Sequence, residues 1–299
     1  MLSFAPLTLA DRERYFAFYA ETPEKCSEYS FFALWGWNES EPIELAWSSG
    51  LCWIRSHGHR EGLLAPVGNW DAVDWEDAFE QCVGPGGALL DVPESLVDRF
   101  PEKLKRRLRL EELRDEWEYV HIAEALRTLK GRKYDHKRTH VRSFVDHYRW
   151  EYVPLLPQDF PELLAFQTEW CARRNCGENP LLCAEDQAIR RALETWNELP
   201  LTGAILRVDG RAVAYTIAEE LAPDTIDIRF EKADSEHAGV YQALNRLFLE
   251  RQGQAYQWVN REEDMGSPGL RDAKMSYHPD RFVKKFEVTF TEKLTGSGD

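Results

Sequence analysis

The sequence contains no long hydrophobic run. Its longest apolar stretch, residues 31–37, is far shorter than the roughly 20 residues that a membrane-spanning helix requires. The N-terminus has no basic start followed by an apolar run and a small-residue cleavage site, so it does not resemble a secretory signal. These absences predict a cytoplasmic protein without integral membrane contact.

Cysteine pairs with metal-binding spacing are missing as well. None of the six cysteines forms a C-x-x-C pair, and the cluster of Cys171, Cys176 and Cys183 has no histidine nearby. His136 and His140 are four residues apart, as in zinc-binding helices, but the sequence places no acidic third ligand beside them. We therefore expect reduced thiols and no metal site.

The sequence also lacks an excess of basic residues. It has 37 Lys and Arg against 52 Asp and Glu, and the formal net charge of -15 disfavours wholesale binding to nucleic acid or anionic lipid. Residues 127–142, called the basic segment below, are a local exception in which only Asp135 opposes the positive charges. This segment could bind tRNA phosphates through Arg127, Lys130, Arg132, Lys133, Lys137, Arg138 and Arg142.

The composition is otherwise that of a folded protein. The chain has 299 residues, of which 43% are hydrophobic, enough for two ordinary domains. In the first half, apolar patterning predicts helices over 8–20, 74–82, 94–108, 123–131 and 136–148, and strands over 43–47, 51–55, 63–67, 88–92 and 117–122. This mixture is typical of an α/β unit.

A second set of elements begins with a strand over 150–153. Strands over 201–208 and 212–218 are joined by Asp209-Gly210, a dipeptide that suits a two-residue hairpin turn. The next strand, 226–231, alternates apolar residues with Asp227, Arg229 and Glu231, which predicts one polar face. A helix from Val240, a strand over 256–259, a helix over 270–277 and a strand over 283–290 follow, and we expect the tail 295–299 to be disordered.

The order of these elements resembles the acetyltransferase (GNAT) fold. The stretch from Ala273 through Tyr277 to Phe282 resembles the A-x-x-x-Y-x-x-x-x-F closing signature of that superfamily. The resemblance implies an α/β (α+β) protein of two tandem GNAT-like halves, 1–149 and 150–299, each a mixed, mostly antiparallel sheet flanked by helices. It also implies that the site lies in the C-terminal half.

The loop before the long helix matches the pyrophosphate-binding turn of that superfamily only in part. Gly239 fits the pattern Q/R-x-x-G-x-G/A, whereas Glu236 and Tyr241 stand where a basic or amide residue and a small residue are usual. A helix N-terminus attracts an anion, but Glu236 would repel a pyrophosphate and Tyr241 would crowd it. The sequence therefore favours weak binding of coenzyme A.

Three longer segments resemble the phosphatidylglycerol lysyltransferase C-terminal-domain family. They are residues 119–148, 230–248 and 260–279. A second resemblance, to peptidoglycan-bridge aminoacyltransferases, rests on Gly266, Gly269, Leu270 and Lys274. Characterised membrane-linked members of the first family pass an aminoacyl group from charged tRNA to a lipid headgroup. The resemblance implies aminoacyl transfer with aminoacyl-tRNA as donor and no bound cofactor.

Acyl transfer to an amine or hydroxyl needs a base, a group that stabilises the oxyanion, and an acid for the leaving group. Glu231, at the end of its strand, is the candidate base, although it could instead pair with Lys232 or Arg229. Lys274 is the candidate for oxyanion stabilisation, and the resemblance assigns the acid to Tyr277. These two residues are three apart on a helix and so share a face.

Substrate-binding candidates follow the strand over 256–259. Ligands of α/β sheets tend to bind at strand ends, and the polar cluster there consists of Asn260, Arg261, Glu262 and Asp264. Arg138 and Arg142, four apart on one helix face, could hold phosphates, and Gly239 could admit a ligand to the helix N-terminus.

Two other functions fit the same sequence. One is an ordinary acyl-coenzyme A N-acyltransferase, and the other is a binding module that keeps the fold and holds a small ligand without catalysis. The sequence does not identify the donor, the acceptor or the oligomeric state.

Overall fold

The computed structural model describes residues 2–58 and 60–291, which fold into two compact units. The first unit comprises residues 2–58, 60–118, 263–267 and 283–291, and the second comprises residues 119–262 and 268–282. The predicted disordered tail 295–299 lies outside the described residues.

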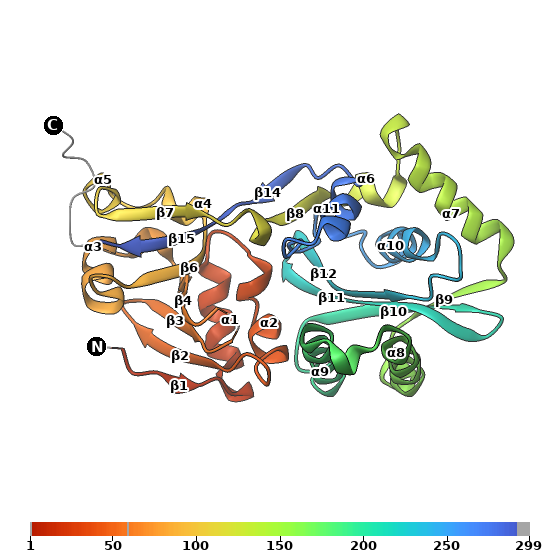
Figure 1. Ribbon diagram of the computed structural model, residues 1–299, viewed down its shortest axis with the longest axis horizontal. Coiled ribbons are helices and arrows are strands. Elements are labelled where there is room, and N and C mark those ends of the chain that lie inside the picture. Colours follow the sequence, from red (N-terminus) through yellow and green to blue (C-terminus); the bar gives the residue numbers. More distant parts are fainter. Residues whose placement is uncertain (1, 59, 292–299) are drawn as a thin grey trace. The chain divides into compact units, whose positions relative to one another are not determined.

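The first unit is built on an eight-stranded sheet (Figure 1). Its path of paired strands is β1-β2-β3-β4-β6-β15-β7, with β5 paired to β3. The strands are β1 (Ala5–Pro6), β2 (Ile43–Ser48), β3 (Leu51–Ser56), β4 (Gly62–Leu64), β5 (Val67–Gly68), β6 (Ala88–Pro93), β7 (Leu108–Glu112) and β15 (Lys285–Phe290). Its helices are α1 (Arg12–Glu21), α2 (Phe31–Gly36), α3 (Trp75–Ala78), α4 (Glu94–Val97) and α5 (Glu102–Lys105).

The second unit has a seven-stranded sheet in the order β14-β8-β13-β12-β11-β10-β9. The strands are β8 (Glu118–Ile122), β9 (Trp150–Pro154), β10 (Leu201–Val208), β11 (Arg211–Ala222), β12 (Thr225–Ala233), β13 (Trp258–Asn260) and β14 (Arg281–Val283). Its helices are α6 (Ala123–Thr128), α7 (Asp135–His147), α8 (Phe160–Arg174), α9 (Pro180–Glu194), α10 (Val240–Arg251) and α11 (Pro268–Met275).

Helices cover both faces of the second sheet. Figure 1 shows α10 on one face, called the α10 face below, and α8 and α9 on the other. The core of the α10 face joins apolar side chains of α10, α6 and α7 to those of the sheet, including Leu244, Phe248, Leu126, Phe144 and Val259. Burying these side chains fixes which strand residues point toward α10.

The fold class is confirmed, since each unit is a mixed, mostly antiparallel sheet flanked by helices. The Asp209-Gly210 turn closes the β10–β11 hairpin as predicted, and both residues have positive φ, at 50° and 79°. The structure also contains α8 and α9, which the sequence patterns did not predict.

Two expectations need correction. In place of the helix predicted over 94–108 there are two short helices: α4 ends at Val97, and α5 begins after Pro101, a residue that disfavours a continuous helix. Residues 108–112 form β7. The units do not divide at 149/150: β8 pairs with β13, and α6 and α7 share the core of α10, so the chain enters the second unit at Tyr119. The closing strand β15 returns to the first sheet, where it pairs with β6 and β7.

Throughout the described part of the chain, no helix combines the length and apolar character needed to cross a membrane.

Candidate active site

A polar cluster lies on the α10 face of the second sheet, where β12 and β13 run parallel. Val259 of β13 belongs to the α10 core and lies opposite His121 of β8 and beside Ile226 of β12. Arg261 comes two residues after Val259, so alternation along the strand directs its side chain to the same face. This face therefore combines charged side chains with an apolar wall.

Glu231 reaches this face because of a β-bulge. Ile217 pairs with Phe230 and Ala218 with Ile228, so Arg229 is an extra residue in β12. Without the bulge, Asp227, Arg229 and Glu231 would share one face, as the alternation predicts. With it, Arg229 remains beside Asp227 on the opposite face, and Glu231 lies across from Thr216 on the α10 face.

Glu231 is held by two partners. Its Oε2 is 2.5 Å from Nη2 of Arg261, and its Oε1 accepts a hydrogen bond of 3.2 Å from the amide of Asn245 in α10. The side chains of Glu231 and Arg261 are only 14% and 13% exposed, so solvent screens this ion pair weakly. Burial alone would lower the pKa of Arg261, but the carboxylate raises it above the usual value. Arg261 is thus a fixed positive charge.

Tyr277 lies against this guanidinium. The Arg261 Cζ is 4.7 Å from the centre of the Tyr277 ring, and the hydroxyl of Tyr134 donates to the Tyr277 carbonyl at 3.1 Å. Burial, opposed by the Arg261 charge, raises the pKa of Tyr277 to about 12. The phenol is therefore protonated at neutral pH and can serve as a proton donor.

Several polar atoms of the α10 face have no hydrogen-bond partner within residues 2–58 and 60–291. They are both ring nitrogens of His121, the hydroxyl of Thr216 and Nη1 of Arg261. Burial, with the charges of Arg261 and Lys133, lowers the pKa of His121 to about 3, so its ring is neutral. Buried polar atoms are seldom left unpaired, which marks this face as a place for a polar ligand group.

Lys274 lies at the edge of the cluster. Its Nζ is 5.9 Å from the centre of the Tyr119 ring on β8, and its charge contributes to the lowered pKa of His121. The structure thus brings Glu231, Arg261 and Tyr277 together and places Lys274 on the His121 side of them.

The other predicted binding residues lie elsewhere. Asn260 is buried and accepts a hydrogen bond from the Glu262 N–H, and Glu262 pairs with Arg229 at 2.8 Å, so both belong to the opposite face. Asp264 folds into the first unit, where it is 3.2 Å from Arg114 and accepts a hydrogen bond from the Gly266 N–H. Asn260 is the last residue of β13, and of these four predicted residues only Arg261 joins Glu231 and Tyr277.

The basic segment is only partly available for a ligand. Arg138 donates to the carbonyls of Leu129 and Gly131 and pairs with Asp135, so it caps the end of α6. Arg142 is exposed on α7, where it remains a candidate for phosphate binding.

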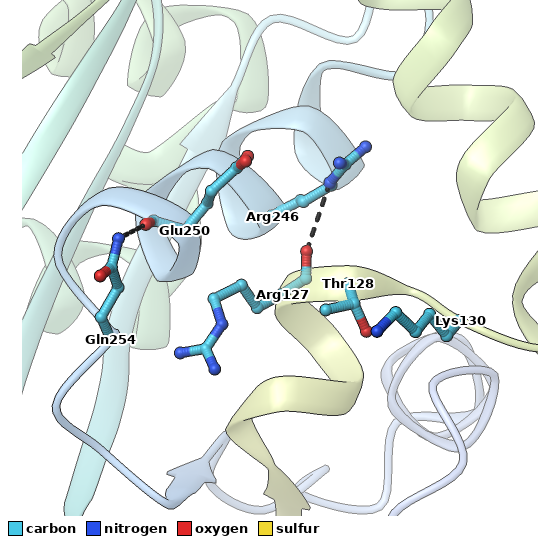
Figure 2. Close-up of a pocket in the computed structure, with 6 residues that line it drawn as sticks. All are labelled: Arg127, Thr128, Lys130, Arg246, Glu250 and Gln254. Atoms are coloured by element: carbon cyan, nitrogen blue, oxygen red, sulfur yellow. Dashed lines mark hydrogen bonds between the residues drawn. The ribbon is translucent and has the colours of Figure 1, made fainter.

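Beside α6 and α10 the surface forms a hollow of about 530 Å³, called the basic hollow below (Figure 2). It is lined by Arg127, Thr128, Lys130, Arg246, Glu250 and Gln254. Arg246 is positioned by a hydrogen bond of 3.3 Å from its Nε to the Arg127 carbonyl, and Figure 2 shows the two guanidinium groups pointing to different sides of the hollow.

The comparisons with known proteins bear on the family and the fold. Residues 19–289 match the family described as phosphatidylglycerol lysyltransferase, C-terminal. The chain belongs to this family. The resemblance seen in the sequence is therefore confirmed.

Two solved structures match nearly the whole length of this chain. A conserved protein of unknown function from Bacteroides thetaiotaomicron VPI-5482 is 32% identical, covers 97% of this chain and 100% of its own, and has a TM-score of 0.87. The structure of L-PGS from Bacillus licheniformis is 14% identical, covers 95% of this chain and 93% of its own, and has a TM-score of 0.63, which shows a shared fold.

Among curated proteins, an uncharacterized protein of Mycoplasmoides gallisepticum is 25% identical over 179 residues. The match covers 57% of this chain and 55% of that protein, so the chain spans about half the length of the curated relative that it matches.

Gly239 has a packing role in this protein. A Cβ at this position would overlap the carbonyl oxygen of His140 in α7, and the residue has a φ of +81°. The N–H groups around it are already used: that of Glu236 donates to Asp234, that of Ala238 to the Tyr148 hydroxyl, and that of Val240 to the His237 carbonyl. The turn therefore offers a pyrophosphate few free donors.

We expect Gly239→Ala to lower the free energy of unfolding by about 3 kcal/mol, because it adds a clash to an unfavourable φ. Gly210→Ala is a matched control, since Gly210 has a φ of +79° with nothing within 4 Å of an added Cβ. It should cost only about 1 kcal/mol in the same urea titration. Equal losses in the two variants would contradict the packing role.

Sequence reasoning missed several residues of the cluster. Asn245 lies next to the apolar stripe of α10, so the sequence pattern placed it on the helix surface. In the structure it is only 2% exposed. His121 shares the face of Tyr119 by strand alternation, a signal that was available in the sequence. Lys137 was noted only as part of the basic segment, although its Nζ lies 3.9 Å from the Tyr277 ring centre.

Proposed function

We propose that this protein transfers an aminoacyl group from an ester donor to an amine or hydroxyl acceptor, on the α10 face of the second unit. The observation that carries the proposal is the buried Nη1 of Arg261, which has no partner in the described part of the chain and lies beside a protonated tyrosine. A buried, fixed guanidinium donor suits the oxyanion that forms when an acyl carbonyl is attacked.

The roles of the neighbouring residues follow from their contacts. Tyr277 donates its proton to the leaving oxygen of the donor, and Glu231 orients Arg261 through the ion pair of 2.5 Å. Lys274 adds positive charge near His121, and the neutral ring of His121 offers a hydrogen bond to the substrate. A neutral imidazole and a fixed cation together favour a ligand that carries a carbonyl and a negative charge nearby.

The donor that we propose is aminoacyl-tRNA, held in part by the basic hollow. Arg127, Lys130 and Arg246 have no acidic partner within the described ranges 2–58 and 60–291, although acidic residues outnumber basic ones in the chain. Because two of the cations point to different sides, an extended phosphodiester backbone would contact more of them than a single phosphate ion would.

Replacing Arg127 and Arg246 together by alanine should weaken filter binding of uncharged tRNA about tenfold at low salt, and should flatten its salt dependence by about one unit of slope per lost phosphate contact. Arg190→Ala is the control, because Arg190 pairs with Asp186 in α9 and does not line the hollow. Unchanged affinity and slope in the double variant would remove the hollow from donor binding.

Transfer itself is tested with tRNA charged with radiolabelled amino acids. Phosphatidylglycerol vesicles in one reaction, and a mixture of primary amines in another, supply the acceptors. We expect protein-dependent label in one acceptor. Saturable tRNA binding without transfer to either acceptor would instead favour the binding-module function.

The coenzyme A alternative makes a different prediction. We expect calorimetry to detect no binding of acetyl-coenzyme A at micromolar concentrations, because Glu236 is acidic and the neighbouring N–H groups are occupied within the protein. Micromolar affinity would favour an acyl-coenzyme A N-acyltransferase over aminoacyl transfer.

A further inference from the structure

The first turn of α7 places an amine beside the proposed proton donor. Lys137 is half-buried, its Nζ lies 3.9 Å from the centre of the Tyr277 ring, and the same Nζ is 2.6 Å from the hydroxyl oxygen of Ser276. Across the described ranges 2–58 and 60–291, Lys137 has no carboxylate within ion-pair distance. This environment differs from that of a solvated surface lysine, which keeps its charge in water.

The direction of the hydrogen bond leaves the amine a free lone pair. The Ser276 hydroxyl donates to the Ala273 carbonyl at 2.6 Å, so it accepts from Nζ of Lys137. An unprotonated Lys137 would therefore donate one hydrogen to Ser276 and keep its lone pair for the proton of another group.

The environment also favours the neutral amine. Burial first, and then the Arg261 charge, lower the pKa of Lys137 to about 8. Roughly one tenth of such amines are unprotonated at pH 7, compared with well under a thousandth for a lysine of ordinary pKa.

Glu231, the base predicted from the sequence, is less suited to this task. Both of its oxygens already accept hydrogen bonds, one from Asn245 and one from Arg261.

We propose that Lys137 is a further catalytic residue, the general base that takes the proton from the acceptor amine or hydroxyl. The assignment rests on the proposed aminoacyl transfer and adds a residue to it. It follows from the contacts of Lys137 with Ser276 and Tyr277 and from the occupied oxygens of Glu231.

The acceptor nitrogen or oxygen forms a bond to the acyl carbon, and its proton passes to Nζ of Lys137. The bond from the acyl carbon to the donor ester oxygen breaks, and that oxygen takes the phenolic proton of Tyr277. The ammonium of Lys137 then returns a proton to the phenolate of Tyr277, which restores both groups.

The first test needs no substrate. Trace acetylation with acetic anhydride is measured by peptide mass spectrometry across a pH series, with Lys103 as an internal reference because it is exposed in the first unit. The labelling rate of Lys137 should rise to a plateau with a midpoint near pH 8. A midpoint near that of free lysine would overturn the proposal, whether or not the protein transfers aminoacyl groups.

The second test uses the transfer assay. Turnover of the unaltered protein should rise with pH through about 8, because the base works only when unprotonated. Lys137→Arg keeps the charge but cannot give up its proton, so it should lower kcat about a hundredfold, abolish this rise and change KM little. Lys103→Gln should behave like the unaltered protein.

The two failures are distinguishable. Full turnover and an unchanged pH profile in Lys137→Arg would overturn the role of Lys137 and leave the proposed function intact. No transfer by the unaltered protein, with a normal fold and a labelling midpoint near pH 8, would overturn the proposed function and with it the role of Lys137 as a base, and only the lowered pKa of Lys137 would stand.

Discussion

Replacing Arg261 by methionine is expected to destabilise the second unit by about 3 kcal/mol and to lower kcat by a hundredfold or more. The loss of stability arises because Glu231, 14% exposed, would remain buried as an uncompensated charge. The loss of turnover arises because Arg261 carries the unpaired Nη1 that we assign to the oxyanion. Urea unfolding and the transfer assay measure the two effects separately.

A double variant separates charge burial from lost packing. Arg261→Met combined with Glu231→Met removes both charges and should recover most of the stability lost in Arg261→Met alone, since replacing a whole buried ion pair costs less than breaking it. Turnover should stay low, because the oxyanion donor is still missing. If the double variant loses more stability than Arg261→Met and Glu231→Met lose together, this account of the ion pair is wrong.

Replacing Tyr277 by phenylalanine should lower kcat about a hundredfold with little change in KM, because it removes one proton donor and keeps the ring between its neighbours. The fold should tolerate the change, since the Tyr134 hydroxyl bonds the Tyr277 backbone carbonyl and not its side chain. Steady-state kinetics with aminoacyl-tRNA as donor provide the measurement.

Tyr256→Phe is the matched control for this substitution. The hydroxyl of Tyr256 donates to Glu220 at 2.7 Å, away from the cluster around Arg261, so its loss should leave kcat unchanged. Turnover of Tyr277→Phe equal to that of the control would exclude Tyr277 as the acid.

A fall in kcat of tenfold or more in Lys274→Ala would support the electrostatic role of Lys274 beside His121.

Much of the fold could be predicted from local signals. The turn at Asp209-Gly210 needs positive φ at both residues, and few other dipeptides adopt this conformation. The β10–β11 hairpin was therefore predictable from these two residues. The helices α8 and α9 were not predicted, and the boundary near residue 150 was misplaced. The pairing of β8 with β13 joins residues more than a hundred positions apart, and no short window of sequence carries that information.

The candidate site shows the same division. Tyr277 was identified from a spacing motif and Arg261 from its place after a strand, and both lie in the cluster. Asn260, Glu262 and Asp264 come from the same run of sequence, yet alternation sends the first two to the opposite face and the chain path takes Asp264 into the first unit. Adjacent polar residues in a sequence therefore did not form one site.

The sequence by itself determined the family, the hairpin and the short helix α11, which ends two residues before Tyr277, because these depend on residue identity at short, regular spacings. Only the tertiary structure decided which partner Glu231 has. The bulge at Arg229 adds one residue to β12, and because side chains alternate with a period of two, that single residue turns Glu231 from Arg229 toward Arg261. The bulge lies in the register between β11 and β12, which no local pattern of apolar and polar residues records.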